Sequence, residues 1–369
     1  MNLIWDCSGV GSGGLVRVVN QLIKSWPVGE DQIRILGLTS STSSKHPSGI
    51  ETDNPLRDNP SPPRRIGHLA HSVIRTRQHL RTADFVFYPS PTPAACIPTS
   101  TPSAVMIHDL RHRVWPAFDG TAIRTYRNFT YARAIASASL VIAVSERTRH
   151  DLLAHYPNCS RKVVVWQEGA DVAAGPQASF MLPPKTYVVV PGHARHKGVE
   201  IALRALPLVQ EDLNFVVLST SSLTSEWSHI IPDGYQGRVT FLEHLNDTQY
   251  VALVRSARAL AMPSHFEGYG LPVAEAIAMG VPTVISPDPA LLEAGSGRAS
   301  QMHAWTPQAF ASSLQDAIGV NYPIGVRNED PRTWKQASAA LRSIFSECRR
   351  KSTETRVPEE DALQTGNSS

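Results

Sequence analysis

The feature that most constrains the fold of this chain is a recurring alternation of short β-branched runs with segments of helical periodicity. The runs are apolar along their whole length, which is typical of strands buried on both faces of a parallel sheet. Helical segments lie between several runs, and parallel strands need such crossovers. The predicted strands of this first series cover residues 3–5, 33–38, 85–88, 104–107, 140–144 and 163–166, and the predicted helices cover residues 15–23, 123–136 and 145–153.

The alternation stops between Asp171 and Pro184, where Gly175, Pro176 and Pro183 break the periodicity, and it then resumes. A chain of 369 residues is long enough for two domains. We therefore predict an α/β protein with a first domain over residues 1–172, a linker over 173–184 and a second domain over 185–330. A C-terminal helix over 331–350 and a disordered tail over 351–369 follow. The second series of predicted strands covers residues 187–190, 215–218, 239–242, 260–262 and 283–285.

Composition narrows the function classes. The net charge of +3 does not indicate a nucleic-acid ligand, whose binding proteins concentrate basic surface. The four cysteines are far apart, which favours a reducing compartment over a disulfide scaffold. The amino end shows no signal peptide and no apolar run reaches the roughly 18 residues of a membrane span, so we expect a cytoplasmic protein. Residues 39–63 are rich in Ser, Thr, Pro and Asn, and we expect a long mobile loop there.

The densest chemical signal lies between Pro263 and Ala276, directly after one predicted strand and at the start of a helix. The backbone N–H groups of Tyr269, Gly270 and Leu271 would be free at the helix entrance, where the helix dipole favours phosphate. Glycines at 268 and 270 let a ligand approach the backbone closely. Two carboxylates, Glu267 and Glu275, flank this phosphate site, and carboxylates accept hydrogen bonds from sugar and ribose hydroxyls.

Taken singly, each element has a plain structural explanation. A lone glutamate at a helix start caps it or complements its dipole, and a pair of glycines makes a turn. The combination is more specific, because it resembles the E-x7-E signature of retaining GT-B glycosyltransferases of family 4. Further segments are similar to that family's motifs: His108-Asp109-Leu110, Val144-Ser145-Glu146 with Asp151-Leu152-Leu153, Gly169-Ala170-Asp171, Gly192 to Gly198, Gly280-Val281-Pro282 with Ser286 and Glu293, and the glycine loop Gly9, Gly11, Gly13 and Gly14.

The resemblance implies two Rossmann-like domains facing each other across a cleft, with the C-terminal helix crossing back to the first. It also implies a retaining sugar transfer in which a donor phosphate oxygen takes the acceptor's proton, without a protein nucleophile. No D-x-D sequence occurs, which agrees with a metal-independent reaction and no cofactor. The residue roles implied are Glu267 on the transferred sugar, Glu275 on the ribose, Lys197 on the diphosphate, His108 near the reacting sugar, Gly13 and Gly14 beside the phosphates or acceptor, and Asp109 on the acceptor side.

The chain departs from the family pattern in the predicted phosphate loop. Many relatives carry Arg after the first glycine or Arg-Lys before the last, whereas this chain places histidines at 193 and 196. Either Arg195 supplies the missing charge, or the histidines bind the diphosphate when protonated, near their ordinary pKa of about 6.5.

A basic segment precedes the third predicted strand. Between Asp58 and Asp84 there is no acidic residue, and Ile66, Leu69, Val73 and Leu80 recur at near-helical spacing. Such a helix suits anionic lipid headgroups, and it equally suits a solvated surface helix packed on the first domain. The basic side chains are Arg64, Arg65, Arg75, Arg77, Arg81, His68, His71 and His79.

Other chemistries fit less well. The histidines match no closed zinc spacing, which makes a metal site an unfavoured alternative, and no G-x-S-x-G elbow indicates a serine hydrolase. Two function hypotheses share the fold: a non-catalytic nucleotide-sugar binder and a nucleotide-sugar epimerase. For a transferase, the sequence leaves donor and acceptor open. We expect a hexose, with GDP-mannose ahead of dTDP- or UDP-linked rhamnose or glucose, and a glycan or lipid-linked acceptor in polysaccharide or glycolipid synthesis, with possible peripheral contact at the inner membrane face.

Overall fold

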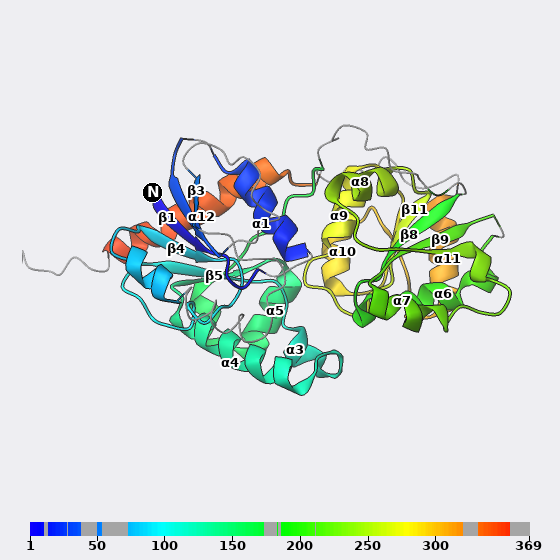
Figure 1. Ribbon diagram of the computed structural model, residues 1–369, viewed down its shortest axis with the longest axis horizontal. Coiled ribbons are helices and arrows are strands. Elements are labelled where there is room, and N and C mark those ends of the chain that lie inside the picture. The colour runs from blue at the N-terminus through cyan, green and yellow to red at the C-terminus, as the bar shows by residue number, and fades with distance from the viewer. Residues whose placement is uncertain are drawn as a thin grey trace, which may run out of the picture.

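The computed structural model describes residues 1–10, 14–27, 29–37, 50–53, 73–172, 183, 186–210, 212–319 and 331–354. Within them the chain forms two parallel sheets, each covered by helices, that lie side by side along the long axis of the molecule (Figure 1). The predicted α/β fold class with two Rossmann-like units is therefore confirmed. Gly11, Gly13, residues 54–72, 173–182 and 355–369 lie outside the described residues.

The first sheet is parallel throughout and has the strand order β3-β2-β1-β4-β5-β6-β7. Its central strands consist mostly of apolar residues that are buried on both faces. Its strands are β1 (Asn2–Asp6), β2 (Gln32–Leu36), β3 (Ile50–Asp53), β4 (Phe85–Tyr88), β5 (Ser103–Ile107), β6 (Leu140–Ala143) and β7 (Val163–Val165).

The helices of this domain connect strands in the expected crossover manner. Ser145 caps α5 as predicted, since its side chain accepts a hydrogen bond from the Thr148 N–H. The helices and 3-10 turns are α1 (Gly14–Ser25), α3 (Arg111–Val114), η2 (Pro116–Phe118), α4 (Thr121–Ser137), α5 (Glu146–His155) and η3 (Pro157–Lys162).

The second sheet is also parallel, with the order β10-β9-β8-β11-β12-β13. Its strands are β8 (Tyr187–Pro191), β9 (Asn214–Leu218), β10 (Val239–Leu242), β11 (Ala259–Met262), β12 (Thr283–Ile285) and β13 (Ser300–Gln301). Its helices and turns are η4 (Arg195–Lys197), α6 (Val199–Arg204), η5 (Leu206–Leu208), α7 (Ser221–Ser228), η6 (Gln236–Arg238), α8 (Asp247–Arg255), α9 (Leu271–Ala278), α10 (Pro289–Gly295) and α11 (Pro307–Ile318).

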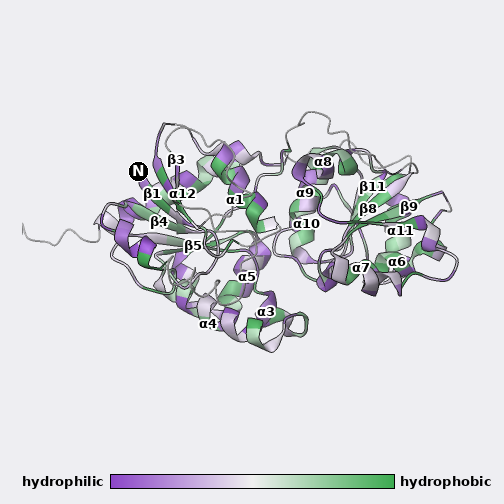
Figure 2. Ribbon diagram, viewed as in Figure 1, coloured by the Kyte–Doolittle hydropathy of each residue, from purple (hydrophilic) through white to green (hydrophobic). Residues whose placement is uncertain are grey.

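Each sheet separates two apolar clusters, one on each face, which is the layered arrangement of a doubly wound fold. In Figure 2 the strands are mostly hydrophobic, while the outer helices carry hydrophilic residues on their exposed sides. The cores thus fix the sheets and leave the loops at the carboxyl ends of the strands free to carry ligand-binding residues.

The last helix, α12 (Trp334–Glu354), crosses back to the first domain and packs beside α1, as the family resemblance implies (Figure 1). Phe345 stacks on Phe85 with a centroid distance of 4.7 Å, and the Arg342 guanidinium pairs with Asp31 at 2.7 Å. The helix includes residues 351–354, where the sequence predicts disorder, because the helical pattern continues to Glu354.

Two further expectations need correction. Residues 50–53 form edge strand β3 within the segment expected to be a loop, because they pair in parallel with β2. The edge strands β7 and β10 are only partly buried, whereas the sequence predicts burial on both faces, because nothing pairs with their outer sides among the described residues.

Candidate donor and acceptor site between the two domains

The predicted strand, turn and helix are present where β11 leads into α9. Gly270, directly before the helix, adopts a φ of +103°, a left-handed conformation that glycine tolerates. No side chain caps α9, so its first N–H groups are available to an anion. Leu271 begins the helix and is buried, while the half-buried Tyr269 places its hydroxyl 3.4 Å from the Glu168 carbonyl oxygen.

Lys197 and Glu267 meet in the second domain. The Lys197 Nζ lies 2.7 and 2.9 Å from the two carboxylate oxygens of Glu267. The loops that carry them touch at Gly198, which packs directly against the Pro263 carbonyl. A Cβ at position 198 would collide with that carbonyl, and the φ of +68° also favours glycine. This charge-assisted pair holds the Lys197 ammonium against the buried carboxylate of Glu267, four residues before the start of α9.

Glu275 lies one turn into α9 and is 1% exposed. Its Oε1 lies 3.0 Å from the Arg17 Nη2 of α1, in the other domain. Burial raises the pKa of Glu275 to about 7, although the charge of Arg17 acts in the opposite direction. The Arg17 guanidinium also stacks over the Tyr250 ring at 4.7 Å. This corner of the site therefore holds a carboxylate that an arginine and an aromatic ring shield from water.

His108 follows β5 in the first domain. Its Nε2 lies 3.0 Å from the Pro89 carbonyl oxygen, and its Nδ1 lies 3.5 Å from Glu168 Oε1. The backbone of Gly268 passes directly against the His108 carbonyl, so close that a Cβ at 268 would collide with it. The backbone of His108 thus contacts the segment that carries Glu267. In the sequence, this proximity is implied only by the family resemblance.

Side chains of the first domain hold that contact in place. The hydroxyls of Ser145 and Thr148 donate to the Gly268 carbonyl oxygen at 2.5 and 3.1 Å. Glu293 of α10 accepts from the Gln167 side chain at 2.7 Å and from the Glu146 N–H at 2.8 Å. The two domains are therefore joined by polar contacts around the candidate site, which suits an interface that opens and closes.

Arg147 extends this network across the interface. Its guanidinium pairs with Asp151 at 2.9 Å and with Asp288 at 3.1 Å, and it lies over the Phe266 ring at 4.5 Å. Burial raises the pKa of Asp288 to about 6, with Arg147 acting in the opposite direction. Asp288 also caps α10 by accepting from the Ala290 N–H. One carboxylate thus joins a helix start in the second domain to α5 of the first.

The basic side chains of the predicted phosphate loop have protein partners. Arg195 forms a bidentate pair with Glu226 at the surface. His196 faces Arg111 of the first domain, whose Nη1 hydrogen-bonds to the ring. Burial, followed by the charges of Lys197 and Arg111, lowers the pKa of His196 to about 2, so the His196 ring is neutral near pH 7. His193 is exposed, and its Nδ1 lies 3.0 Å from the Leu218 carbonyl oxygen.

The other predicted residues are more dispersed. Gly14 is the exposed first residue of α1, and Gly13 lies outside the described residues. Asp109 accepts a hydrogen bond from the Arg111 N–H at 3.0 Å, which shapes the turn after β5. Arg75, Arg77 and Arg81 belong to the separate helical segment 73–79 and its end, while Arg64, Arg65, His68 and His71 are outside the described residues.

Sequence reasoning missed three residues at the interface: Arg17, Arg111 and Glu168. Arg17 follows the glycine loop by one turn and Arg111 follows Leu110 directly, so their positions offer a signal. Their partners, Glu275 and His196, lie in the other domain and become neighbours only in the fold.

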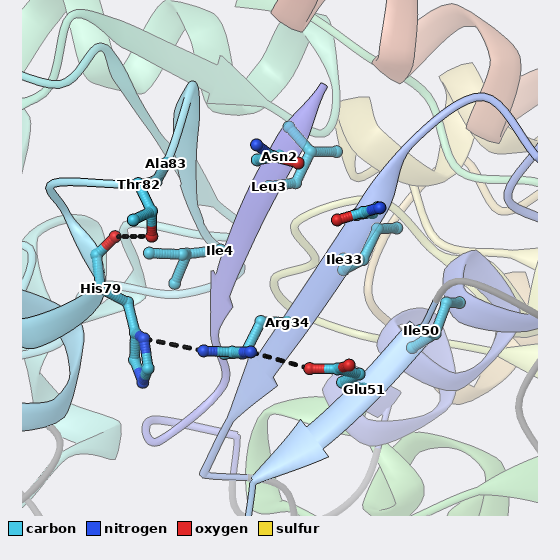
Figure 3. Close-up of a pocket in the computed structure, with 11 residues that line it drawn as sticks. Asn2, Leu3, Ile4, Ile33, Arg34, Ile50, Glu51, His79, Thr82 and Ala83 are labelled. Atoms are coloured by element: carbon cyan, nitrogen blue, oxygen red, sulfur yellow. Dashed lines mark hydrogen bonds and ion pairs between the residues drawn. The ribbon is translucent and has the colours of Figure 1, made fainter.

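A separate cavity of about 370 Å³ lies against the first sheet (Figure 3). Arg34 spans it, pairing with Glu51 at 2.8 Å and reaching His79 Nδ1 at 2.9 Å. Its walls come from β1, β2, β3 and residues 79–83, and include none of the predicted site residues. Among the described residues, no cluster of His, Cys, Asp or Glu could hold a metal ion, and no helix is long and apolar enough to cross a membrane.

Two family models match the chain. The first half matches Glycosyltransferase Family 4 over residues 12–174, and the second half matches Glycosyl transferases group 1 over residues 185–319. Among curated proteins, a glycogen synthase of Mycobacterium tuberculosis is 31% identical over 131 residues, which are 34% of this chain and 32% of that protein. The O-antigen chain mannosyltransferase RfbU of Salmonella typhimurium is 21% identical over 60% of this chain and 62% of its own length. The chain thus spans less than two thirds of either relative.

Solved structures of similar fold cover almost the whole chain. A sucrose-phosphate synthase from Thermosynechococcus elongatus superposes with a TM-score of 0.66 at 16% identity, covering 96% of this chain and 98% of that one. Anabaena HepE in complex with UDP-glucose gives 0.63 at 16% identity, covering 96% and 99%. Two facing Rossmann-like units with this interdomain site define a protein of the GT-B fold. Within that class, the chain belongs to glycosyltransferase family 4.

Proposed function

We propose that this protein transfers a hexose from a nucleotide diphosphate sugar to a hydroxyl of a glycan or lipid-linked acceptor, with retention of configuration and without a metal ion. The observation that carries the proposal is the Lys197–Glu267 pair, whose carboxylate stands on the loop directly before the uncapped start of α9, with the buried Glu275 farther along that helix. Anion, sugar and ribose partners are thus grouped on one loop and one helix. Family membership supports a nucleotide-sugar donor, and HepE, a protein of similar fold, was solved in complex with UDP-glucose.

In this proposal the diphosphate lies at the start of α9, and Lys197 faces it. The bond between the anomeric carbon and the phosphate oxygen breaks, the acceptor oxygen bonds to the same carbon, and the acceptor proton passes to a diphosphate oxygen. Negative charge grows on the leaving diphosphate, so Lys197 and the helix N–H groups stabilise the transition state more than the ground state. Glu267 accepts hydrogen bonds from the transferred sugar, Glu275 accepts from the ribose, and His108 borders the sugar from the first domain.

Arg111 replaces Arg195 as the second cation near the phosphate loop in this proposal. Arg111 already contacts His196, whereas Arg195 is engaged by Glu226. The transferred sugar is proposed to be mannose, with glucose or rhamnose as alternatives. The mannosyltransferase relative supports mannose, and the UDP-glucose complex of HepE supports glucose.

A non-catalytic nucleotide-sugar binder is the second candidate. The neutral His196 and the surface-paired Arg195 reduce the positive charge of the phosphate loop, which would weaken transition-state stabilisation more than binding. Such a protein would bind donor and release no nucleotide. The epimerase hypothesis remains a fold-level alternative, and it predicts conversion of the free nucleotide sugar without an acceptor.

The first test is a thermal-shift panel with GDP, UDP, dTDP and their sugar conjugates, in EDTA, on wild type, Glu267→Ala and Glu275→Ala. A ligand at 100 times its dissociation constant adds about 2.7 kcal/mol to stability. We expect one base to shift the melting temperature in EDTA and both variants to lose that shift. Absence of a shift with every nucleotide would contradict the donor site, and a shift that needs added metal would contradict the metal-independent reaction.

Peripheral contact with an anionic membrane is proposed as part of acceptor access at the inner face. In the helical segment 73–79, Val73 packs inward with Leu80, while Ile74 is 56% exposed and Arg77 and Arg81 point outward. Helix α4 offers a second face, because Ile123, Tyr126 and Phe129 are exposed at a spacing of three and the helix contains no acidic residue.

Vesicle cosedimentation shows which of these two surfaces binds the membrane. We expect binding to anionic vesicles, and no binding to neutral ones, with loss either in Arg75→Glu/Arg77→Glu/Arg81→Glu or in Ile123→Ser/Tyr126→Ser/Phe129→Ser. The face whose variant loses binding is the membrane face. Unchanged binding in both variants would contradict contact through either surface.

A further inference from the structure

The seven tryptophans of this chain fall into two groups. Five are at most 4% exposed and belong to the domain cores or pack against them. The other two, Trp115 and Trp305, are 38% and 41% exposed. Exposing a large aromatic ring to water is unfavourable, so two such rings in one place indicate a binding surface.

Both exposed tryptophans lie close to the ring of His265. The centroid of the His265 ring is 5.4 Å from that of Trp115 and 6.5 Å from that of Trp305, and it is nearly parallel to the Trp305 ring, at 17°. Phe118 lies 5.2 Å from Trp115 and 6.2 Å from His196. These five rings, Trp115, Phe118, His196, His265 and Trp305, form a continuous group that we call the aromatic rim.

The aromatic rim crosses the domain interface at the predicted site. Trp115 and Phe118 belong to the first domain, in and beside η2, after the His108-Asp109 turn. The other three rings belong to loops that follow β8, β11 and β13. The rim is therefore built at the carboxyl ends of strands from both sheets, where open α/β sheets bind ligands. His196 precedes Lys197 directly, and His265 stands two residues before Glu267.

Hydrogen bonds fix the rings of the second domain. The Trp305 indole N–H donates to the Ser264 carbonyl oxygen at 3.0 Å, the His265 Nε2 lies 2.6 Å from Glu200 Oε1, and the His265 N–H donates to the His196 carbonyl oxygen at 2.8 Å. Rings held by their edges keep their faces available at little cost in side-chain entropy on binding. A charged pair also lies beside the rim. Arg111 pairs at 2.9 Å with Asp119, the residue that follows Phe118.

We propose that the aromatic rim is a saccharide subsite that stacks a pyranose ring of the acceptor. This inference rests on the proposed function and specifies its acceptor class as a glycan or a sugar-bearing lipid. A pyranose has an apolar C–H face, which packs on aromatic rings, and an edge of hydroxyls, which suits the Arg111–Asp119 pair. The stacked sugar belongs to the acceptor, because Lys197 and Glu267 are assigned to the donor and two of the rings come from the first domain.

The test uses the two accessible tryptophans as reporters. Methyl α-D-mannopyranoside, methyl β-D-glucopyranoside and maltose are titrated into the full chain, and tryptophan fluorescence and its quenching by iodide are followed. Variants are Trp115→Ala, Trp305→Ala and the conservative Trp305→Phe, with Leu208→Ala as the control for a large exposed apolar side chain outside both the rim and the proposed membrane faces. Unchanged melting temperatures establish that the variants fold.

We expect at least one saccharide to change the fluorescence and to protect tryptophan from iodide, with the effect lost in both alanine variants, retained in the control and partly restored in Trp305→Phe. In transfer assays, each alanine variant should raise the acceptor KM about tenfold and leave the KM for donor within about twofold. Saccharides that leave the wild-type signal unchanged, or alanine variants that keep the acceptor KM, would overturn the rim. A response to lipid vesicles in place of saccharides would also overturn it.

Failure of the rim and failure of the proposed function have different signatures. If saccharides bind in a manner that depends on Trp115 and Trp305 while no nucleotide shifts the melting temperature, the subsite is supported and the transferase proposal is contradicted. If a nucleotide binds through Glu267 and Glu275 while no saccharide changes the tryptophan signal, the donor site is supported and the saccharide subsite is contradicted.

Discussion

Arg17 Nη2 and Glu275 Oε1 lie 3.0 Å apart, although Arg17 lies in the first turn of helix α1 and Glu275 belongs to the second domain. The carboxylate is buried and the guanidinium is largely so, which makes the pair a charged contact in a low-dielectric interface. In the proposed function the donor ribose must reach Glu275, so binding of donor has to rearrange this pair.

Removing Arg17 should therefore destabilise the protein more at high pH than at low pH. Arg17→Met leaves Glu275 buried without its cation, and we expect a loss of about 3 kcal/mol in the free energy of unfolding at pH 8. The loss should shrink at pH 5, where Glu275 is protonated. Urea unfolding at both pH values measures it, with Arg149→Met, which removes a surface pair with Glu146, as the control. Equal losses in the two variants would contradict a special role for Arg17.

The raised pKa of Glu275 predicts a pH dependence with a definite sign. Its folded pKa of about 7 exceeds the ordinary value of 4.5, so the folded state binds the proton more tightly than the unfolded state. This carboxyl therefore makes the folded protein lose stability as pH rises from 4.5 to 7. Glu275→Gln lacks this titration and should gain up to about 3 kcal/mol relative to wild type over that window, and nothing further above it.

Unfolding free energies of wild type and Glu275→Gln, measured from pH 4.5 to 8.5, test that sign. Taking the difference between the two proteins cancels the titration of His196 and Asp288, which also have shifted pKa values. A difference that stays constant across the window would show that Glu275 titrates normally.

Lys197 should matter for turnover more than for folding. Lys197→Met removes the ammonium beside the diphosphate, and we expect kcat/KM to fall about 10²- to 10³-fold, with Lys197→Arg closer to wild type. Release of nucleoside diphosphate in an acceptor-dependent assay measures this. The control is Lys335→Met, at an exposed position of α12. A Lys197→Met variant with normal kcat/KM would remove Lys197 from the mechanism.

Gly268 should tolerate no side chain. A Cβ there would collide with the His108 carbonyl, and the Gly268 carbonyl is held by Ser145 and Thr148. Gly268→Ala should push the domains apart, lower activity at least about tenfold and increase the radius of gyration in solution scattering. Gly237→Ala, whose Cβ would meet open space, should change neither quantity. An active, compact Gly268→Ala protein would show that this contact is dispensable.

Local pattern was enough to predict most of the fold. Apolar β-branched runs such as 85–88 and 283–285 became strands at the predicted bounds, because a central parallel strand needs burial on both faces along its whole length. Ser145 capped its helix for a reason contained in four consecutive residues. Edge strands were harder to predict. Residues 50–53 form a short and largely polar segment, and only its pairing with β2 makes it a strand.

The sequence by itself determined the turn from Glu267 to Leu271, the uncapped helix after it and the presence of Lys197 in a glycine-bounded loop, because each depends on neighbouring residues. Only the tertiary structure decided that Glu275 faces Arg17, that Arg111 contacts His196 while Arg195 pairs with Glu226, and that Trp115 and Trp305 share one rim. These contacts join residues of separate domains. Their electrostatics depend on burial and on charges brought together by packing, which no local pattern contains.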